Sequence, residues 1–333
     1  MDLFIESEKG GPTVSKPIIL LKEKFKPDQI DRIKAAAEEY QIIDTHDSAV
    51  SYQEEDIQIM LGWDKELGPR LLNNPNSKLK WVQSISAGVD SYDLSAFEER
   101  NILLSNGSGI HTISISEHVL GVLLARYRGL LQAATVQQDK QWKDASVDYR
   151  QLSGQSMLIV GTGNIGQQLA SFAQGLKIRT YGINSSGHPS PGFLECYSQK
   201  NMNRIIKDMD IVVNILPLTE ATYYLYNEEM FQSMKENSIF INVGRGRSVK
   251  TDDLVQALEN GPIAFAALDV FEEEPLPKDS PLWTMENVLI TPHISGMTDG
   301  FKEKLLAIFL TNLASFINEG TLKQNQVNLE RGY

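Results

Sequence analysis

The feature that most constrains this chain is a glycine motif directly after a short apolar run. Met157–Val160 predicts a buried strand, and Gly161, Gly163 and Gly166 follow with the spacing G-x-G-x-x-G, ahead of a helix that opens at 167–172. The first glycine allows a tight turn, the second lets the backbone approach a pyrophosphate, and the third lets helix and strand pack closely. A helix N-terminus adds free N–H groups and partial positive charge. The motif predicts nucleotide binding; the alternative is a glycine-rich turn in an ordinary βα unit.

Composition excludes several classes of protein. The 333 residues suggest two domains, and the net charge of −12 without a basic cluster argues against nucleic acid or an anionic membrane as a partner. Cys196 is the only cysteine, so an intramolecular disulfide is excluded and a reducing compartment fits. The first apolar run, residues 18–21, is too short for a signal peptide or a membrane span. We expect a cytoplasmic protein with a flexible lead-in at residues 1–16 and no metal site.

The hydrophobic pattern predicts two α/β units. The first has strands at 17–21, 57–61, 79–85 and 102–104, with a helix at 27–40. The second has six strands, at 157–160, 177–182, 211–216, 239–243, 265–269 and 288–291. Strands that alternate with helical stretches imply a parallel sheet with helices on both faces. The expected fold class is therefore α/β, with two doubly wound, Rossmann- or flavodoxin-like domains.

Two glycine-containing stretches predict where the chain passes between the domains. One is the loop at 106–109, followed by an apolar helix at 117–131 with Ser116 as its N-cap; the other contains Gly296 and Gly300, ahead of a helix at 302–318. The terminal helix is expected to return to the first domain. The predicted substrate domain is then discontinuous, 1–104 plus 299–333, and 105–298 is the dinucleotide-binding domain. Clefts between domains are common ligand sites.

Three residues follow predicted strands, at the edge where open α/β sheets bind ligands: Arg245, Glu274 and His293. Each alone has an ordinary explanation, namely a surface ion pair, a solvated acid, or a histidine that satisfies backbone groups. Together they suit hydride transfer to a 2-keto acid. An arginine can grip a carboxylate at two points and polarise the keto oxygen. A histidine can donate a proton to that oxygen, a step worth about 10²–10⁴-fold, and a glutamate bonded to the histidine favours its protonated form.

With these residues the chain resembles the D-isomer-specific 2-hydroxyacid dehydrogenase family, which includes glyoxylate and hydroxypyruvate reductases, D-lactate dehydrogenase and phosphoglycerate dehydrogenase. The matching segments are SAGVD, GTGNIG, LPLTEAT, INVGRGRSV, ALDVFEEEPLP and TPHISG, which span about residues 81–296 in the family's order. Arg245, Glu274 and His293 fall on the family's catalytic positions.

The resemblance also implies binding roles for other residues. The backbone of Ala87, Gly88 and Val89 would receive the substrate carboxylate, although SAGVD is otherwise a plain turn. The cofactor would meet Asn164 and Ile165 at its pyrophosphate. Further cofactor contacts are implied for Leu216, Pro217, Thr222, Val243, Gly244, Asp269 and Gly296; a strand-end cap is the alternative role for Asp269.

One departure from the family bears on the coenzyme. Members that use NAD usually carry an acid about 20 residues after the glycines, which binds the ribose 2′-hydroxyl. Here that position is Asn184, followed by Ser185 and Ser186, and no acid occurs between Gly166 and Glu195. A carboxylate would repel a 2′-phosphate by about 4 kcal/mol at 4 Å and an effective dielectric constant near 20. The absence of an acid, with His188 nearby, favours NADP(H). Because no arginine follows Asn184 in this loop to bind a 2′-phosphate, weak binding of NAD(H) is the alternative.

We therefore expect a reductase of small 2-keto acids that yields D-2-hydroxy acids, with NADPH as the favoured coenzyme. The alternatives are a nucleotide-sensing protein like the family's corepressor relatives, or an NAD-dependent phosphoglycerate dehydrogenase. Formate dehydrogenase is disfavoured because that branch has glutamine at the Glu274 position. Trp63 either faces the substrate and favours small or apolar side chains, or packs in the core. A homodimer through the apolar helix at 117–131 is expected from the family.

Overall fold

The structure is a computed structural model that describes residues 16–47, 51–142 and 149–330. The predicted lead-in therefore lies, except for Lys16, outside the described residues. The chain divides into two compact units, unit 1 (1–108 and 300–333) and unit 2 (109–299). The first predicted boundary, after residue 104, lies four residues from the observed division after 108. The second, after residue 298, lies one residue from the division after 299.

Unit 1 is built on a five-stranded sheet with the order β2-β1-β3-β4-β5. The strands are β1 (Ile18–Leu21), β2 (Gln41–Asp44), β3 (Ile57–Leu61), β4 (Trp81–Gln83) and β5 (Leu103–Ser105), and every pairing is parallel. The sequence did not predict β2, because this edge strand fully buries only Ile43 and so lacks an apolar run. The strand order 2-1-3-4-5 is that of flavodoxin-like folds.

Four helices cover the sheet of unit 1: α1 (Pro27–Ala36), α2 (Leu67–Asn73), α3 (Leu94–Glu99) and α10 (Phe301–Glu319). The prediction that α1 runs to residue 40 is wrong, because the chain turns after Ala36 to enter β2. Trp81 of β4 stacks on Phe309 of α10 with 5.0 Å between ring centroids. This buried aromatic pair holds the C-terminal helix against a sheet formed by residues 18–105.

Unit 2 is built on a seven-stranded parallel sheet with the order β12-β11-β10-β9-β6-β7-β8. The strands are β6 (Ser156–Val160), β7 (Arg179–Asn184), β8 (Glu195–Ser198), β9 (Ile211–Asn214), β10 (Ser238–Asn242), β11 (Ile263–Leu268) and β12 (Val288–Ile290). The predicted parallel, doubly wound architecture is confirmed, with one strand more than predicted. The missed strand, β8, buries none of its residues fully. The strand order reverses between β6 and β9, which is where such sheets bind ligands.

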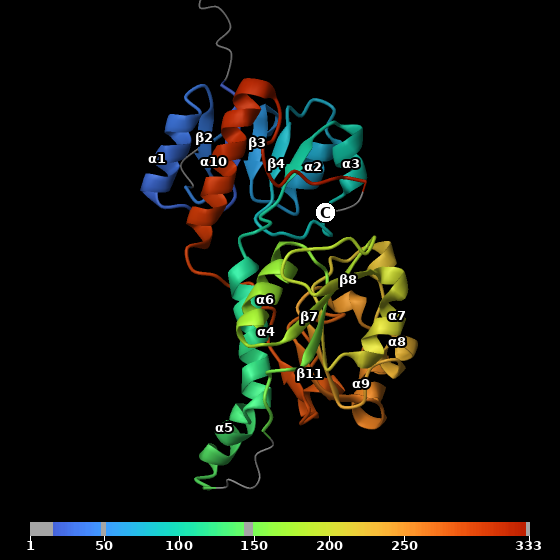
Figure 1. Ribbon diagram of the computed structural model, residues 1–333. Helices are drawn as coiled ribbons and strands as arrows, with labels where there is room; N and C mark the ends of the chain where they lie inside the picture. The colour runs from blue at the N-terminus through green and yellow to red at the C-terminus, as the bar shows by residue number, and fades with distance from the viewer. Residues whose placement is uncertain (1–15, 48–50, 143–148, 331–333) are drawn as a thin grey trace, which may run out of the picture. The chain divides into compact units, whose positions relative to one another are not determined.

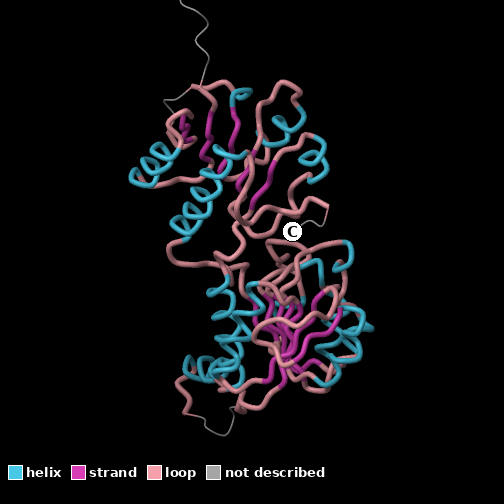
Figure 2. Tube along the Cα trace, turned by 45° about the horizontal axis from the view of Figure 1, so that its top comes forward, coloured by secondary structure: helices cyan, strands magenta, loops and turns pink. Residues whose placement is uncertain are grey.

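The helices of unit 2 lie around its sheet (Figure 2). They are α4 (Thr112–Tyr127), α5 (Leu130–Gln138), α6 (Asn164–Gly175), α7 (Met202–Ile205), α8 (Glu228–Gln232) and α9 (Thr251–Asn260), and α4 packs against α6 (Figure 1). The prediction of Ser116 as an N-cap is wrong: α4 begins one turn earlier, and the Ser116 hydroxyl donates back to the Thr112 carbonyl at 2.8 Å. The predicted helix at 117–131 also breaks, since Gly129 takes a left-handed φ of 67° before α5.

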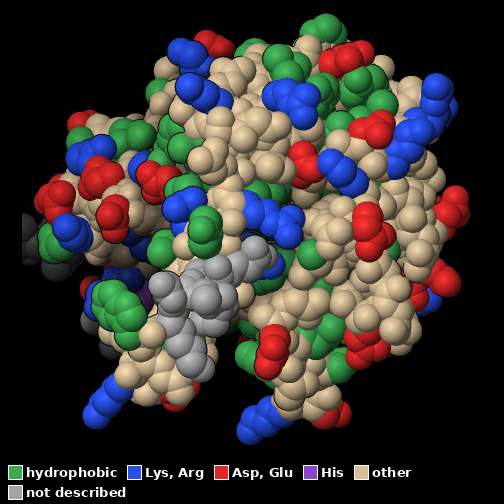
Figure 3. Space-filling view, turned by 60° about the horizontal axis from the view of Figure 1, so that its bottom comes forward, with side chains coloured by type: hydrophobic (Ala, Val, Ile, Leu, Met, Phe, Trp, Pro, Cys, Tyr) green, Lys and Arg blue, Asp and Glu red, His purple; other side chains and the backbone are tan. Residues whose placement is uncertain are grey.

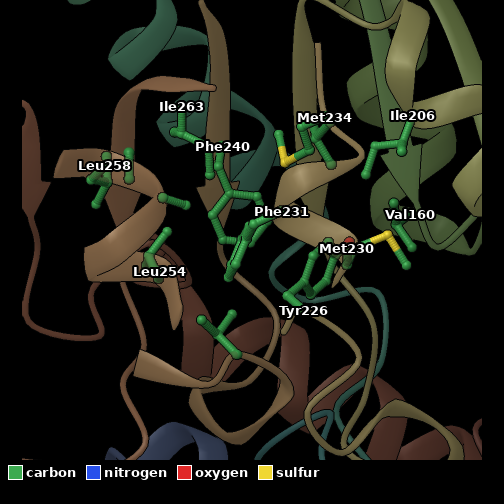
Figure 4. Close-up of a cluster of buried hydrophobic side chains, with 14 of the residues drawn as sticks. Val160, Ile206, Tyr226, Met230, Phe231, Met234, Phe240, Leu254, Leu258 and Ile263 are labelled. Carbon is green, nitrogen blue, oxygen red and sulfur yellow. The ribbon is translucent and has the colours of Figure 1, made fainter. Parts of the chain in front are cut away.

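One of the two cores of unit 2 lies under α8 and α9 (Figure 4). Phe240 of β10 is fully buried between Tyr226 and Phe231, with ring centroids 4.8 and 5.5 Å away. Burying side chains of this size contributes about 1.5–3 kcal/mol each to folding. The strand β10 is thereby held firmly just before the loop that carries Arg245.

No single helix in the described part of the chain is long and apolar enough to cross a membrane, and α4 and α5 meet that test only together, as a pair bent by 66°. Lysine and arginine side chains are interspersed with acidic ones on the face drawn in Figure 3. On that face the charges of either sign are not gathered into one patch.

Candidate active site

The glycine motif forms the predicted strand–turn–helix of unit 2. Gly161 has a φ of 115°, and a Cβ on Gly166 would lie 2.0 Å from the Gly161 carbonyl oxygen, so both positions require glycine. A Cβ on Gly163 would meet nothing within 4 Å, which leaves open space beside the turn. Gln167 is the first amide bonded inside α6, to Gly163 O at 2.9 Å, so the amides of 164–166 precede the helical ladder. These donors and this space fit a dinucleotide pyrophosphate.

The loop after β7 is organised by Asn184. Its Oδ1 accepts from the amides of Ser186, Gly187 and His188 at 3.3, 2.6 and 3.2 Å, and its Nδ2 donates to the His188 carbonyl at 2.9 Å. Asn184 Nδ2 also donates to Thr162 Oγ1 of the glycine turn at 3.1 Å, so the amide group is engaged on both its oxygen and its nitrogen. The side chains of Ser185, Ser186 and His188 are exposed, and the Ser186 hydroxyl lies 2.9 Å from His188 Nδ1. The loop presents these neutral polar groups and the imidazole to solvent.

Arg245 lies on a loop whose backbone is held by hydrogen bonds from buried polar side chains. Its carbonyl accepts from Asn242 Nδ2 at 3.1 Å and from Ser248 Oγ at 2.6 Å. Asn214 Nδ2, from the end of β9, donates to both Asn242 Oδ1 and Ser248 Oγ. All three supporting residues are at most 1% exposed. The network fixes the backbone from which the half-buried Arg245 side chain begins, and Arg245 Nη1 itself donates to Gly244 O at 2.9 Å.

Glu274 and His293 are brought into direct contact. His293 Nδ1 lies 2.7 Å from Glu274 Oε2, and Glu274 Oε1 accepts from the amide of Phe271 at 3.0 Å. The His293 and Glu274 side chains are 57% and 35% exposed, so the pair is open to a ligand. A Cβ on Gly246 would lie only 1.7 Å from Phe271 O, which shows how closely the Arg245 loop approaches the Glu274 loop.

Asp269, one residue beyond β11, ties the His293 segment to the sheet. Its carboxylate accepts from Thr291 Oγ1 at 2.6 Å and from the amides of Ile294 and Ser295 at 2.9 Å each. Burial of Asp269 opposes its ionisation, but the hydrogen bonds from Ser295, Thr291 and Ile294 outweigh burial and hold its pKa below the ordinary value. The carboxylate is thus both an anion and a strand-end anchor.

The other residues predicted to contact the cofactor lie at the same carboxyl edge of the sheet. A Cβ on Gly161 would be 3.5 Å from Leu216, which places the loops after β6 and β9 side by side. The buried Thr222 hydroxyl donates to Pro217 O at 2.7 Å and so shapes its own loop. Val243 is buried, and Gly296 O lies 2.6 Å from His111 Nδ1. Their cofactor contacts, like those of Asn164, Ile165 and Gly244, stay predictions.

In unit 1, three backbone carbonyl groups of the SAGVD loop after β4 each accept a hydrogen bond. Ala87 O accepts from Asn106 Nδ2 at 2.8 Å, Gly88 O from Ser86 Oγ at 2.7 Å, and Val89 O from the Tyr92 amide at 3.0 Å. Among the described residues, none accepts a hydrogen bond from the amide of Gly88 or Val89. The loop therefore offers amide donors to an anion, as the prediction of carboxylate binding requires.

Trp63 packs within unit 1 and also borders a cavity. Its ring lies against Tyr92 and Phe97, with centroids 4.9 and 5.8 Å away, and a Cβ on Gly68 would be 2.3 Å from it. A cavity of about 370 Å³ is lined by Trp63, Lys65, Pro69, Leu72, Asn73, Ser91, Asp93 and Ala96. The packing alternative therefore holds for one side of the ring, while a contact with substrate stays a prediction.

Sequence reasoning missed four residues that support the site, namely the buried Asn214, Asn242 and Ser248 and the half-buried His118. Asn214 and Asn242 each end an apolar strand run, VVN and FIN, and a polar residue at that position was a usable signal. Ser248 and His118 had no comparable signal, because their roles depend on contacts with distant segments.

The comparisons with known proteins agree with this geometry. Residues 120–295 match the family model "D-isomer specific 2-hydroxyacid dehydrogenase, NAD binding domain". The chain is 30% identical over 324 residues to glyoxylate/hydroxypyruvate reductase B of Klebsiella pneumoniae, covering 94% of this chain and 98% of that protein.

Two solved structures are also similar. An NADPH-dependent glyoxylate/hydroxypyruvate reductase from Sinorhizobium meliloti, solved with NADP and sulfate, is 27% identical with a TM-score of 0.80, covering 96% of this chain and 100% of that one. A phosphoglycerate dehydrogenase from Lactobacillus plantarum is 38% identical with a TM-score of 0.56, covering 93% and 100%.

Proposed function

We propose that this chain, which belongs to the D-isomer specific 2-hydroxyacid dehydrogenase family, reduces a small 2-keto acid to the D-2-hydroxy acid with NADPH as the coenzyme. The observation that carries the proposal is the contact of 2.7 Å between His293 Nδ1 and Glu274 Oε2. It lies at the carboxyl edge of a sheet whose glycine loop fits a dinucleotide pyrophosphate. An acid–base pair and a dinucleotide site on one sheet edge are what hydride transfer with protonation needs.

His293 is the proposed proton donor. Because Glu274 occupies Nδ1, the nitrogen that remains to face a substrate oxygen is Nε2. The Glu274 carboxylate holds the ring at Nδ1, and its own position is fixed by the Phe271 amide. The coenzyme supplies a hydride to the carbonyl carbon when it is bound. A positioned acid at the carbonyl oxygen accelerates such a reduction about 10²–10⁴-fold.

Arg245 is the residue proposed to bind the substrate carboxylate. Its backbone is fixed by Asn242 and Ser248, so the side chain starts from a defined point. A guanidinium presents donors in a planar fork, which matches a 2-keto carboxylate at two points and polarises the keto oxygen. The amides of Ala87, Gly88 and Val89 in unit 1 are proposed to bind a carboxylate.

The proposed preference for NADPH rests on the loop after β7. Ser185, Ser186 and His188 offer exposed hydroxyl and imidazole groups. Ser198, the last residue of β8, pairs in register with Asn184, the last residue of β7. Lys200 follows Ser198 by two residues, so a cationic side chain comes soon after the end of the neighbouring strand. Glu195, three residues before Ser198, lies about 10 Å back along the strand, too far to repel a 2′-phosphate strongly. The NADPH-dependent reductase of Sinorhizobium meliloti supports the same choice.

The experiment measures NADPH and NADH oxidation by the purified protein with glyoxylate, hydroxypyruvate and pyruvate. The proposal predicts turnover of at least one keto acid and a higher kcat/KM with NADPH than with NADH. Coenzyme binding without turnover of any keto acid would contradict the reductase and support a nucleotide-sensing protein.

Phosphoglycerate dehydrogenase is the second candidate, favoured by the 38% identity to the Lactobacillus plantarum protein. The discriminating assay is NAD⁺ reduction with 3-phosphoglycerate. Faster turnover in that assay than in keto-acid reduction with NADPH would select this alternative.

We also propose a homodimer formed through α4 and α5. The helix α5 buries none of its residues, and Leu130 is 55% exposed. Ile113 and Leu124 of α4 are exposed as well, which leaves apolar surface for a second copy. Light scattering with size-exclusion chromatography should give twice the mass of 37.3 kDa, and Leu130→Glu should lower it toward the monomer. A monomeric wild type would contradict this proposal.

A further inference from the structure

The segment that carries His293 depends on its surroundings for its shape. Residues 291–296 form no helix or strand, and His293 has a φ of 55°, in the left-handed region that residues other than glycine rarely adopt. Such a conformation persists only where neighbouring groups hold it. Asp269 provides one set of restraints, through its carboxylate and through its carbonyl, which accepts from the His293 amide at 2.9 Å.

A second set of restraints comes from α4, which lies far away in the sequence. His111, Ser114 and His118 are spaced by three and four residues, so they share one side of the helix. His111 Nδ1 lies 2.6 Å from Gly296 O, and Ser114 Oγ donates to the same carbonyl at 3.3 Å. His118 Nε2 lies 3.4 Å from Thr291 Oγ1. This side of α4 therefore contacts the segment at both ends, 291 and 296, with His293 between them.

The hydrogen bonds have a defined direction. Thr291 has one hydroxyl proton, and it donates this proton to the Asp269 carboxylate at 2.6 Å. The hydroxyl can then only accept from His118, which requires a proton on His118 Nε2. Burial lowers the pKa of His118 despite the opposing charge of Asp269, so the neutral ring is favoured. The resulting chain runs from His118 through Thr291 to Asp269, and successive bonds in such a chain polarise one another.

We infer that His118 is a positioning residue for His293, acting through Thr291 and Asp269 at the start of the segment. The inference rests on the proposed function, because it assigns a role toward the proton donor of that reaction. His118 touches neither substrate nor coenzyme in this assignment. Its loss is expected to displace the imidazole of His293 rather than remove a contact to a ligand, and misplacement of a reacting group by about 1 Å can cost about 10²-fold in rate.

The test compares variants that keep or remove the donor at residue 118. His118→Leu removes it, and His118→Gln places an amide N–H close to the position of Nε2. Thr291→Val removes the hydroxyl, and Thr291→Ser keeps it. The matched control is His46→Leu in unit 1, where the histidine is exposed and bonded to Asp44. Steady-state reduction of glyoxylate by NADPH gives kcat and KM, fluorescence quenching gives the Kd for NADPH, and melting temperatures report folding.

We expect His118→Leu and Thr291→Val to lower kcat about tenfold or more while the Kd for NADPH stays unchanged. The His118→Gln, Thr291→Ser and His46→Leu variants should stay near the wild type. The double variant His118→Leu/Thr291→Val should cost no more than the worse single variant, because both remove the same chain of bonds. Unchanged kcat in His118→Leu, failure of glutamine to rescue, or additive losses in the double variant would overturn the inference.

A measurement without substrate separates this inference from the proposed function. The five histidines of the chain can be assigned in ¹⁵N NMR spectra by single substitutions. His118→Leu should shift the imidazole signals of His293, whereas His46→Leu should not. Inactivity of the wild type toward every keto acid would defeat the proposed function while these spectra still tested the link. Unshifted His293 signals in His118→Leu would defeat the link even in an active enzyme.

Discussion

The coenzyme preference is predicted to depend on the side chain at residue 184, and Asn184→Asp is the perturbation that tests it. The new carboxylate keeps an oxygen to accept from the amides of Ser186, Gly187 and His188. It loses the Nδ2 donor that now serves both the His188 carbonyl at 2.9 Å and the Thr162 hydroxyl at 3.1 Å. The Thr162 hydroxyl, 3.1 Å away, can turn and donate to the carboxylate. The folding cost should therefore be about one hydrogen bond, 0.5–1.5 kcal/mol.

The effect on coenzyme choice follows from charge. A carboxylate 4 Å from one phosphate charge is repelled by about 1 kcal/mol at the dielectric constant of water and about 4 kcal/mol at an effective value of 20. Asn184 is half-buried, which places the penalty between these limits. Since about 1.4 kcal/mol is a factor of ten, kcat/KM with NADPH should fall at least about fivefold. With NADH the carboxylate can accept from the ribose 2′-hydroxyl, so the preference should reverse.

The assay is steady-state kinetics of the wild type and the variant with both coenzymes and one keto acid. Asn227→Asp is the matched control, because it adds the same charge to unit 2 at the N-cap of α8, where aspartate is equally suited to accept from Met230. The control should keep the preference for NADPH, and the relative rates for different keto acids should not change in either variant. A wild type that prefers NADH tenfold, or an Asn184→Asp variant that still prefers NADPH, would refute the reasoning.

Three further substitutions test individual groups. Arg245→Lys should reduce kcat/KM nearly as much as Arg245→Ala, because an ammonium group cannot reproduce the two-point grip; recovery of most activity by lysine would contradict it. Asp269→Asn should lower kcat, since its NH2 group would face the N–H of either Ile294 or Ser295 in place of an acceptor, and wild-type kcat would count against the anchor. Hydrogen bonds from Leu67 and Lys22 lower the pKa of Asp64 to about 2. Asp64 therefore stabilises unit 1 above about pH 4 and loses this effect as pH falls toward 2, so Asp64→Asn should cost about 2 kcal/mol in urea unfolding at pH 7 but little at pH 2.

The location of the candidate site could be predicted from the sequence because parallel strands end at one edge. Arg245 and Asp269 follow β10 and β11, and His293 follows β12, so strand ends alone place them on neighbouring strands. The glycine spacing placed the turn between β6 and α6 for the same reason, since only glycine tolerates the approach of residue 166 to Gly161 O.

The contacts that support the site could not be predicted, because they join side chains from distant segments. Asn214 and Ser248 are 34 residues apart, and His118 and Thr291 are 173 residues apart. The start of α4 was also missed, since the β-branched residues of HTISIS favour extended structure locally and the helix is stabilised by packing of Val119 and Leu123 in the core.

The most direct test of the proposed reaction is the turnover of His293→Ala measured beside its affinity for NADPH. If His293 donates the proton, kcat for keto-acid reduction should fall by about two orders of magnitude or more, while the Kd for NADPH stays at the wild-type value. Turnover near that of the wild type would show that the proton comes from another group and would contradict the mechanism built on the contact between His293 and Glu274.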